Sequence, residues 1–209
     1  MTRFETVQYN LSIVLKVLMG LLIIISAFRQ EMFLVIVTAV VLFLSFVPAI
    51  ISKSYKIRLP IEIDLLVTVL LYLHYVLGEY SHFYLKYSWW DLFLHGGNSL
   101  LLGLAGFILA YGLLLTSRVT AKPFFIALFS LSFAVFIGVL WEIFEFLMDY
   151  FFGFTMQKSG LVDTMTDLMM DVAGGFVISF LGFLYMKKKR PSILGKIIKK
   201  YVEYKYKDD

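Results

Sequence analysis

The sequence has no cysteine and few charged residues for its length. None of its 209 residues is Cys, and only 16% are charged, against 60% hydrophobic and 18% aromatic residues. The absence of cysteine excludes disulfides and thiolate chemistry. The shortage of charge, with a mean hydropathy of +0.84, excludes a soluble domain of this length. We therefore expect an integral membrane protein.

Hydrophobic segments long enough to cross a bilayer recur along the chain. The hydrocarbon core is about 30 Å thick and a helix rises about 1.5 Å per residue, so one crossing needs roughly 20 apolar residues. These segments are apolar all round, which favours helices. We predict an all-α polytopic membrane bundle of about six transmembrane helices, at 9–28, 32–51, 61–77, 92–116, 123–152 and 168–186.

Lysine and arginine lie mainly on one side of this arrangement. With the N-terminus in the cytoplasm, 15 of the 19 basic residues fall in cytoplasmic segments, and only Arg29, Lys86 and Lys158 fall outside. The positive-inside rule therefore predicts that both termini are cytoplasmic. Lys16 lies within the first helix; we expect it to extend its ammonium group to the inner surface, with pairing to a buried acid as the alternative.

The end of the chain has a different composition. Hydrophobic residues recur at helical spacing between lysines after Pro191, which is typical of an amphipathic helix on the anionic inner leaflet. We predict one transmembrane domain over 1–190 and a basic amphipathic cytoplasmic tail over 191–209. The net charge of +4 follows from topology, and the sequence has no nucleic-acid-binding motif.

Acids and histidines concentrate at the predicted outward-facing helix ends. Ionisable residues inside a membrane are costly and mark functional sites. The set comprises His74, Glu79, His82, Asp91, His95, Glu142, Glu145, Asp149, Asp163, Asp167 and Asp171. Residues three or four apart share one helix face. That spacing occurs in Asp91-x-x-x-His95, in Glu142-x-x-Glu145 and in Asp163-x-x-x-Asp167-x-x-x-Asp171.

The chemistry of this set favours a cation. Buried carboxylates without counter-charges must be protonated or share a cation, and carboxylates with imidazole suit Mg²⁺, Mn²⁺ or Zn²⁺. We predict a divalent metal held by Glu142, Glu145, Asp167 and Asp171. We further predict that His95, oriented by Asp91, serves as general acid or base. Structural alternatives remain: Asp149 and Asp163 as loop charges, Asp163 as a helix N-cap, and His95 as a packing residue.

The same residues carry a family resemblance. The order Asp91-x-x-x-His95, Gly103, Trp141-Glu142-x-x-Glu145 and Asp163-Thr164-x-x-Asp167-x-x-x-Asp171-x-x-Gly174 resembles the YjdF-like family of bacterial inner-membrane proteins. It is also distantly similar to VanZ-like proteins, which tend to have Glu-x-x-Gln and Asp-x-x-x-Asn in place of the second and last pairs. The resemblance covers about the last three helices. It implies a multi-pass protein of the bacterial cytoplasmic membrane, without implying a reaction.

Three classes of function fit these observations. The first is a metal-dependent hydrolase or transferase acting on a lipid-linked or envelope substrate at the outer leaflet. The second is a cation- or proton-coupled transporter, which would require polar residues through to the cytoplasmic side. The third is an accessory protein whose acids bind a partner's basic segment. We favour the enzyme over the transporter because the inner halves of the last three helices carry no charge and no broken helix is predicted.

Overall fold

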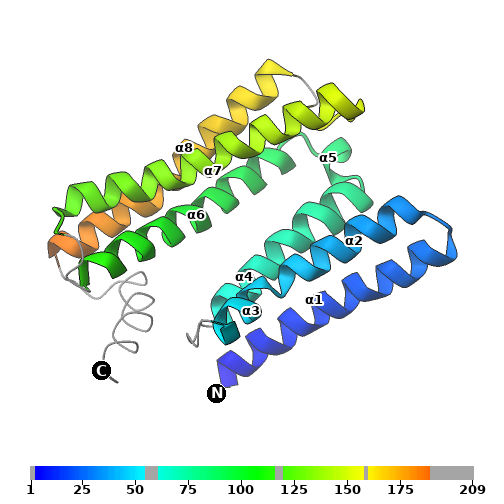
Figure 1. Cartoon of the computed structure of the whole chain (residues 1–209), viewed down its shortest axis with the longest axis horizontal. Coiled ribbons are helices and arrows are strands. Elements are labelled where there is room, and N and C mark those ends of the chain that lie inside the picture. Colours follow the sequence, from blue (N-terminus) through cyan, green and yellow to red (C-terminus); the bar gives the residue numbers. More distant parts are fainter. Residues whose placement is uncertain (1–2, 55–60, 116–119, 158–159, 189–209) are drawn as a thin grey trace. The chain divides into compact units, whose positions relative to one another are not determined.

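The computed structural model describes residues 3–54, 61–115, 120–157 and 160–188, and these residues form helices without a strand (Figure 1). The all-α prediction is therefore confirmed. Within the described ranges, five helices are long and apolar enough to cross a membrane, and a sixth span is counted when one bent pair of helices is taken together. The predicted cytoplasmic tail at 191–209 lies outside these ranges. The contacts divide the chain into two compact units, Met1–Ser88 and Trp89–Asp209, and the prediction of one domain over 1–190 stays a prediction.

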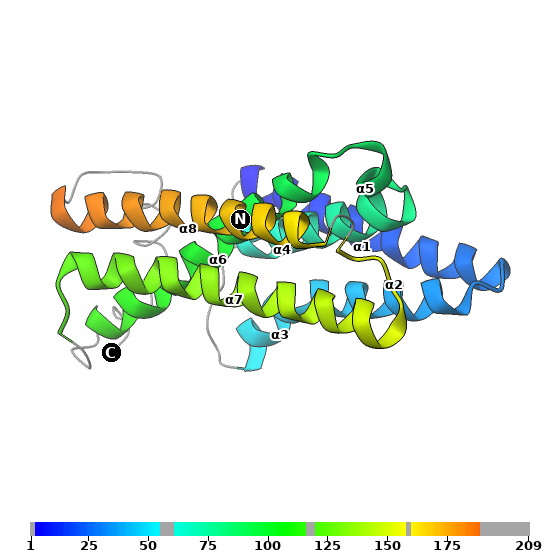
Figure 2. The same cartoon turned by 90° about the horizontal axis from the view of Figure 1, so that it is seen from above.

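The first unit is built on α1 (Arg3–Phe28), which contacts α2 (Met32–Ser45) and α4 (Ile61–Leu71). A π-helical segment, η1 (Tyr72–Tyr80), follows α4, and the short α5 (Phe83–Lys86) comes after it. Figure 2 gives a second view of α1, α2 and α4 lying alongside one another. Tyr75 ties η1 to α2, because the hydroxyl of Thr38 donates to the Tyr75 oxygen at 2.8 Å. The core of this unit therefore carries buried polar contacts between helices.

The second predicted span is not one continuous helix. Helix α2 ends at Ser45 and α3 (Val47–Ser54) continues at an angle of 41°. Pro48 lies in the first turn of α3, where a residue without a backbone N–H can start a helix but cannot continue the preceding one. The expectation that the bundle contains no broken helix is thus wrong for this segment.

Lys16 and Asp64 form a buried ion pair between α1 and α4. The Lys16 ammonium lies 2.8 Å from Oδ1 and 2.9 Å from Oδ2 of Asp64. Ser12 donates a hydrogen bond to the same carboxylate at 2.5 Å, and the centre of the Phe46 ring lies 4.9 Å from the Lys16 nitrogen. The expectation that Lys16 extends to the inner surface is therefore wrong. In apolar surroundings, the Lys16 ammonium group is stabilised by pairing with a nearby carboxylate, and the side chain does not need to extend to water.

The second unit is a three-helix bundle of α6 (Trp90–Leu115), α7 (Pro123–Phe152) and α8 (Leu161–Lys188), each in contact with the other two. Helix α7 has the predicted bounds. Helix α8 begins at Leu161 instead of residue 168, because its acids belong to the first turns of the helix and lower the local hydropathy. Glycines allow close packing: a Cβ at Gly174 would overlap the backbone oxygen of Gly96 on α6, and one at Gly182 would overlap the ring of Phe107. Small residues at helix contacts are typical of membrane bundles.

The ion pair leads to a prediction about stability. We expect Lys16→Met or Asp64→Leu alone to lower the free energy of unfolding by about 3–5 kcal/mol, because each leaves an uncompensated buried charge. The double variant leaves no charge and should recover most of that loss. The measurement is unfolding of purified protein in mixed micelles, with the exposed residue change Arg29→Gln as control. Single variants as stable as the control would contradict the structural role of the pair.

Candidate functional site

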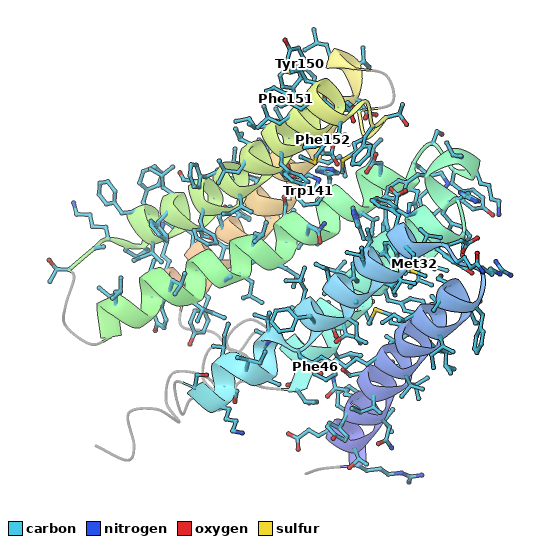
Figure 3. All side chains as sticks on the ribbon, turned by 45° about the vertical axis from the view of Figure 1, so that its right-hand side comes forward. Met32, Phe46, Trp141, Tyr150, Phe151 and Phe152 are labelled. Atoms are coloured by element: carbon cyan, nitrogen blue, oxygen red, sulfur yellow. The ribbon has the colours of Figure 1, made fainter. Side chains whose placement is uncertain are left out.

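The polar residues of the second unit gather at one end of its three-helix bundle. The chain runs along α6, returns along α7 and runs again along α8, so the start of α6, the end of α7 and the start of α8 lie together. Trp141, labelled in Figure 3, marks the level of the site on α7. Lys122 and Lys187 lie at the opposite ends of their helices. By the positive-inside rule, we expect the acidic end to face outside, and this orientation stays a prediction.

Most of the predicted site residues are buried in this bundle. The exposed fraction is 7% for His95, 4% for Glu142, 8% for Glu145, 1% for Asp167 and 2% for Asp171. The side chain of Asp91 remains 18% exposed. The described structure thus brings all six residues to one end of the bundle, and it leaves Asp91 as the most accessible of them. Their chemical roles stay predictions.

His95 lies between carboxylates from all three helices. Its Nδ1 is 3.4 Å from Oδ1 of Asp171 on α8. Its Nε2 is 3.7 Å from Oε1 of Glu142 on α7 and 3.9 Å from Oδ1 of Asp91 on its own helix. Both ring nitrogens therefore face acids, and the histidine is the centre of the cluster.

One subset has the geometry of a metal-binding group. Asp91, His95 and Asp167 each offer one ligand atom, and the three atoms lie within 4.8 Å of one another. This set shares only Asp167 with the four ligands predicted from the sequence. The group forms because Asp91 and His95, four residues apart, share one face of α6, and Asp167 of α8 lies opposite that face.

Several carboxylate oxygens of the cluster are buried without a hydrogen-bond partner among the described residues. They are Glu142 Oε1, Glu142 Oε2, Asp167 Oδ1 and Asp171 Oδ2. Gln157 and Thr164, close to Glu142, are hydrogen-bonded to each other at 2.8 Å. Gln157 also donates to the backbone oxygen of Glu142 at 3.4 Å. A buried charged oxygen without a donor is costly, so these atoms call for a proton or a cation.

Two residues that the sequence analysis did not single out as site residues bond to the cluster. Ser99 donates a hydrogen bond to Asp171 Oδ1 at 2.6 Å, and Trp141 Nε1 donates to Glu145 Oε1 at 2.8 Å. Ser99 follows His95 by four residues and so shares its helix face; that spacing was an available signal. Trp141 is also four residues from Glu145. That spacing alone does not indicate that the indole N–H of an otherwise apolar side chain turns toward the carboxylate.

Gly138 provides the space that Asp171 occupies. A Cβ at position 138 would overlap Oδ2 of Asp171 and lie within 3.2 Å of its Cβ. A side chain at position 138 would therefore displace the Asp171 carboxylate from its place beside His95.

The acids beyond the cluster have structural contacts. Asp149 accepts backbone N–H bonds from Met156 and Gln157, both at 2.8 Å, and so holds the loop after α7. The interpretation of Asp149 as a loop residue fits these bonds, although the residue is half-buried. Asp163 lies in the first turn of α8, so the N-cap interpretation is wrong. An acid in this turn still interacts favourably with the helix dipole.

The remaining predicted residues belong to the first unit. His74 Nδ1 and the Tyr84 hydroxyl are 2.5 Å apart. Glu79 is exposed, and His82 is an exposed residue in the left-handed conformation before α5. We therefore define the candidate site, called the acid cluster below, by residues of the second unit alone: Asp91, His95, Glu142, Glu145, Asp167 and Asp171.

These features define a multi-pass membrane protein with a buried cluster of acids around one histidine. The chain matches the model of the family described as "Predicted membrane protein (DUF2238)" over residues 11–188 and belongs to that family. DUF2238 is the YjdF family, so this part of the predicted resemblance is confirmed. The VanZ-like part finds no support in the matches.

A relative from Thermotoga maritima, described as an uncharacterized protein, is 29% identical over 187 residues, which cover 87% of this chain and 92% of the relative. No solved structure matches the chain. The family description supports a membrane protein, and neither description names a reaction.

The close contact between Gly138 and Asp171 leads to a second prediction. We expect Gly138→Ala to lower the free energy of unfolding by about 1–3 kcal/mol, the usual cost of overpacking. Gly112→Ala is the matched control, since a Cβ there meets nothing within 4 Å. In an Asp171→Ala background the Gly138→Ala change should cost much less. If that cost is the same in both backgrounds, the contact between Gly138 and Asp171 is not what limits this position.

Proposed function

We propose that the acid cluster binds a divalent metal ion and that the protein is a metal-dependent hydrolase or transferase of the bacterial cytoplasmic membrane. The observation that carries the metal site is the burial of Glu142 and Asp167 with carboxylate oxygens that lack hydrogen-bond partners. Among the described residues, neither carboxylate forms an ion pair with a lysine or arginine. A divalent cation would supply the missing charge.

The donor set fits such an ion. Asp91, His95 and Asp167 are the nearest three ligands, and Glu142 lies on the Nε2 side of His95 at 3.7 Å. Carboxylates with one imidazole suit Mn²⁺ or Zn²⁺, and a carboxylate-rich set also suits Mg²⁺. Asp91 is the most accessible of these ligands, with 18% of its side chain exposed, so it marks the side from which the ion and a substrate would enter.

The surroundings of the site favour an amphipathic substrate. At the end of α7, Tyr150, Phe151 and Phe152 are between 65% and 71% exposed (Figure 3). Aromatic side chains in such positions lie at the membrane interface. A lipid-linked molecule would place its polar group at this depth, beside the acidic ends of the helices.

The proposed reaction is hydrolysis or transfer at a phosphoryl or acyl group. A metal bound here would polarise the reacting oxygen and activate the attacking water or hydroxyl. Glu142, whose carboxylate lies 3.7 Å from His95 Nε2, would accept the proton of the attacking group. That proton then passes to the departing ester oxygen, which leaves as an alcohol while the phosphoryl or acyl group stays with the attacking oxygen. General acid–base transfer of this kind contributes about 10²–10⁴-fold.

A transporter finds less support in the same geometry. Helices α6, α7 and α8 are continuous through their described lengths, and the broken span belongs to the other unit. Toward the opposite end of the bundle, Ser130 donates to the Gly103 carbonyl at 2.7 Å and Ser179 to the Phe176 carbonyl at 3.0 Å. Hydroxyl groups satisfied by backbone do not form a polar path for a permeant ion.

The metal site has a direct test in detergent-purified protein. We expect near-stoichiometric Mg²⁺, Mn²⁺ or Zn²⁺ by elemental analysis, and stabilisation by about 2.7 kcal/mol when the reloading metal is at a hundredfold excess over Kd. Asp167→Asn and His95→Gln should lose both the metal and the stabilisation, because each removes a ligand. Glu79→Gln, which changes an exposed acid of the first unit, is the control and should behave as wild type. Metal retained in Asp167→Asn and His95→Gln alike would contradict the proposed site.

A further inference from the structure

We propose that residues 153–157, called the strap below, close the acid cluster between α7 and α8 and retain the bound metal. Asp149 anchors the strap to α7, and Gln157 is the latch that joins it to both helices. The retention role rests on the proposed function, whereas the closure can be tested in protein without metal.

The strap runs back along α7 instead of leading away from it (Figure 2). Helix α7 is followed by Gly153, whose positive φ of 68° reverses the chain and whose N–H bonds to the Asp149 carbonyl at 3.0 Å. Gln157 then reaches the backbone oxygen of Glu142, which lies about 15 Å of helix before Phe152. The strap therefore folds over the part of α7 that carries the site.

Asp149 fixes the path of the strap. Its Oδ1 accepts the N–H of Met156 and its Oδ2 accepts the N–H of Gln157, both at 2.8 Å. Asp149 follows Glu142 by two helical turns and so lies on the same face of α7. The anchor thus holds the strap on the face of α7 that contributes to the acid cluster.

Gln157 joins α7 to α8 through one amide group. Its Nε2 donates to Thr164 Oγ1 at 2.8 Å and to the backbone oxygen of Glu142 at 3.4 Å. A backbone oxygen only accepts hydrogen bonds, so the NH₂ group faces α7, and its two hydrogens serve the two helices. Thr164 is three residues before Asp167 and shares its face of α8. Each contact of the latch therefore lies beside an acid of the cluster.

The strap covers one side of the acid cluster and leaves another side accessible. Glu142 is 4% exposed and Asp167 1%, whereas the side chain of Asp91 on α6 is 18% exposed. Met156 and Gln157, the strap residues that bond to Asp149, are half-buried. While the latch is closed, a metal in the cluster exchanges on the Asp91 side. Release of the latch adds a second route between α7 and α8.

The closure can be tested with a reporter thiol, because the chain contains no cysteine. Glu142→Cys keeps the backbone oxygen that Gln157 bonds to and places the only thiol under the strap. We expect a water-soluble maleimide to label this thiol slowly. Adding Gln157→Ala should accelerate labelling about tenfold, since losing one or two hydrogen bonds raises the population of the open strap by that order.

The controls separate release of the strap from general loosening of the bundle. Asp149→Asn presents an NH₂ group to a strap N–H and should act in the same direction as Gln157→Ala. Thr155→Ala, a change at an exposed residue of the same strap, should leave the labelling rate of Glu142→Cys unchanged. Ser130→Cys, at a fully buried position whose serine bonds to the Gly103 carbonyl, should stay unreactive with and without Gln157→Ala.

The retention role is tested by Mn²⁺ exchange in protein that keeps Glu142. A second route speeds entry and release alike, so Gln157→Ala should raise the association and dissociation rate constants by the same factor, again about tenfold. The Kd should then stay unchanged. A residue that only supports the ligands would instead raise the dissociation rate and the Kd together.

The outcomes distinguish the strap from the metal site. If Glu142→Cys is labelled at the same rate with and without Gln157→Ala, closure by the strap is overturned, and the metal site stands on its own test. If labelling accelerates and no metal binds, closure stands and the proposed function fails. If Mn²⁺ binds and Gln157→Ala raises only the dissociation rate, the retention role is overturned.

Discussion

The cost of burying carboxylates among apolar helices determines the organisation of this protein. An unpaired ionised carboxylate is expensive away from water, yet the second unit buries Glu142, Glu145, Asp167 and Asp171 around a single histidine. The first unit meets the same cost at Asp64 with an ion pair to Lys16. The two solutions differ: the first unit carries its counter-charge in the sequence, and the acid cluster does not. That difference is the reason to propose a bound cation.

Close packing of α6, α7 and α8 holds the acid cluster together. Gly174 allows α8 to approach the α6 backbone, and Gly138 allows Asp171 to lie against α7. These contacts place ligand atoms from α6 and α8 within 4.8 Å of one another. A rigid frame suits metal binding, since the ligands need no rearrangement that would cost conformational entropy. The helices thus provide both the apolar surroundings that make the acids costly and the geometry that lets them share an ion.

Much of the fold and the site could be predicted from local sequence patterns. Long apolar runs predicted the spans, and spacings of three and four residues predicted which acids share a face. Contacts between distant residues could not be predicted in the same way: Lys16 and Asp64 are far apart in sequence, and neither the direction of a lysine side chain nor its partner follows from a hydropathy pattern. The bend after Ser45 could not be predicted from Pro48 alone, because it also depends on how the surrounding helices pack. Hydropathy also placed the start of α8 too late, because the acids that form the site reduce the apolar signal of the helix that carries them.

The central claim is that His95 binds a divalent metal in the acid cluster. The most direct measurement is pulsed electron paramagnetic resonance of purified protein loaded with Mn²⁺ and cleared of excess ion, using ¹⁵N-histidine labelling to identify nitrogen ligands. The account predicts bound Mn²⁺ coupled to one histidine nitrogen, with the coupling lost in His95→Gln and kept in His74→Gln and His82→Gln. Failure to retain Mn²⁺, or bound Mn²⁺ without a histidine coupling, would contradict it.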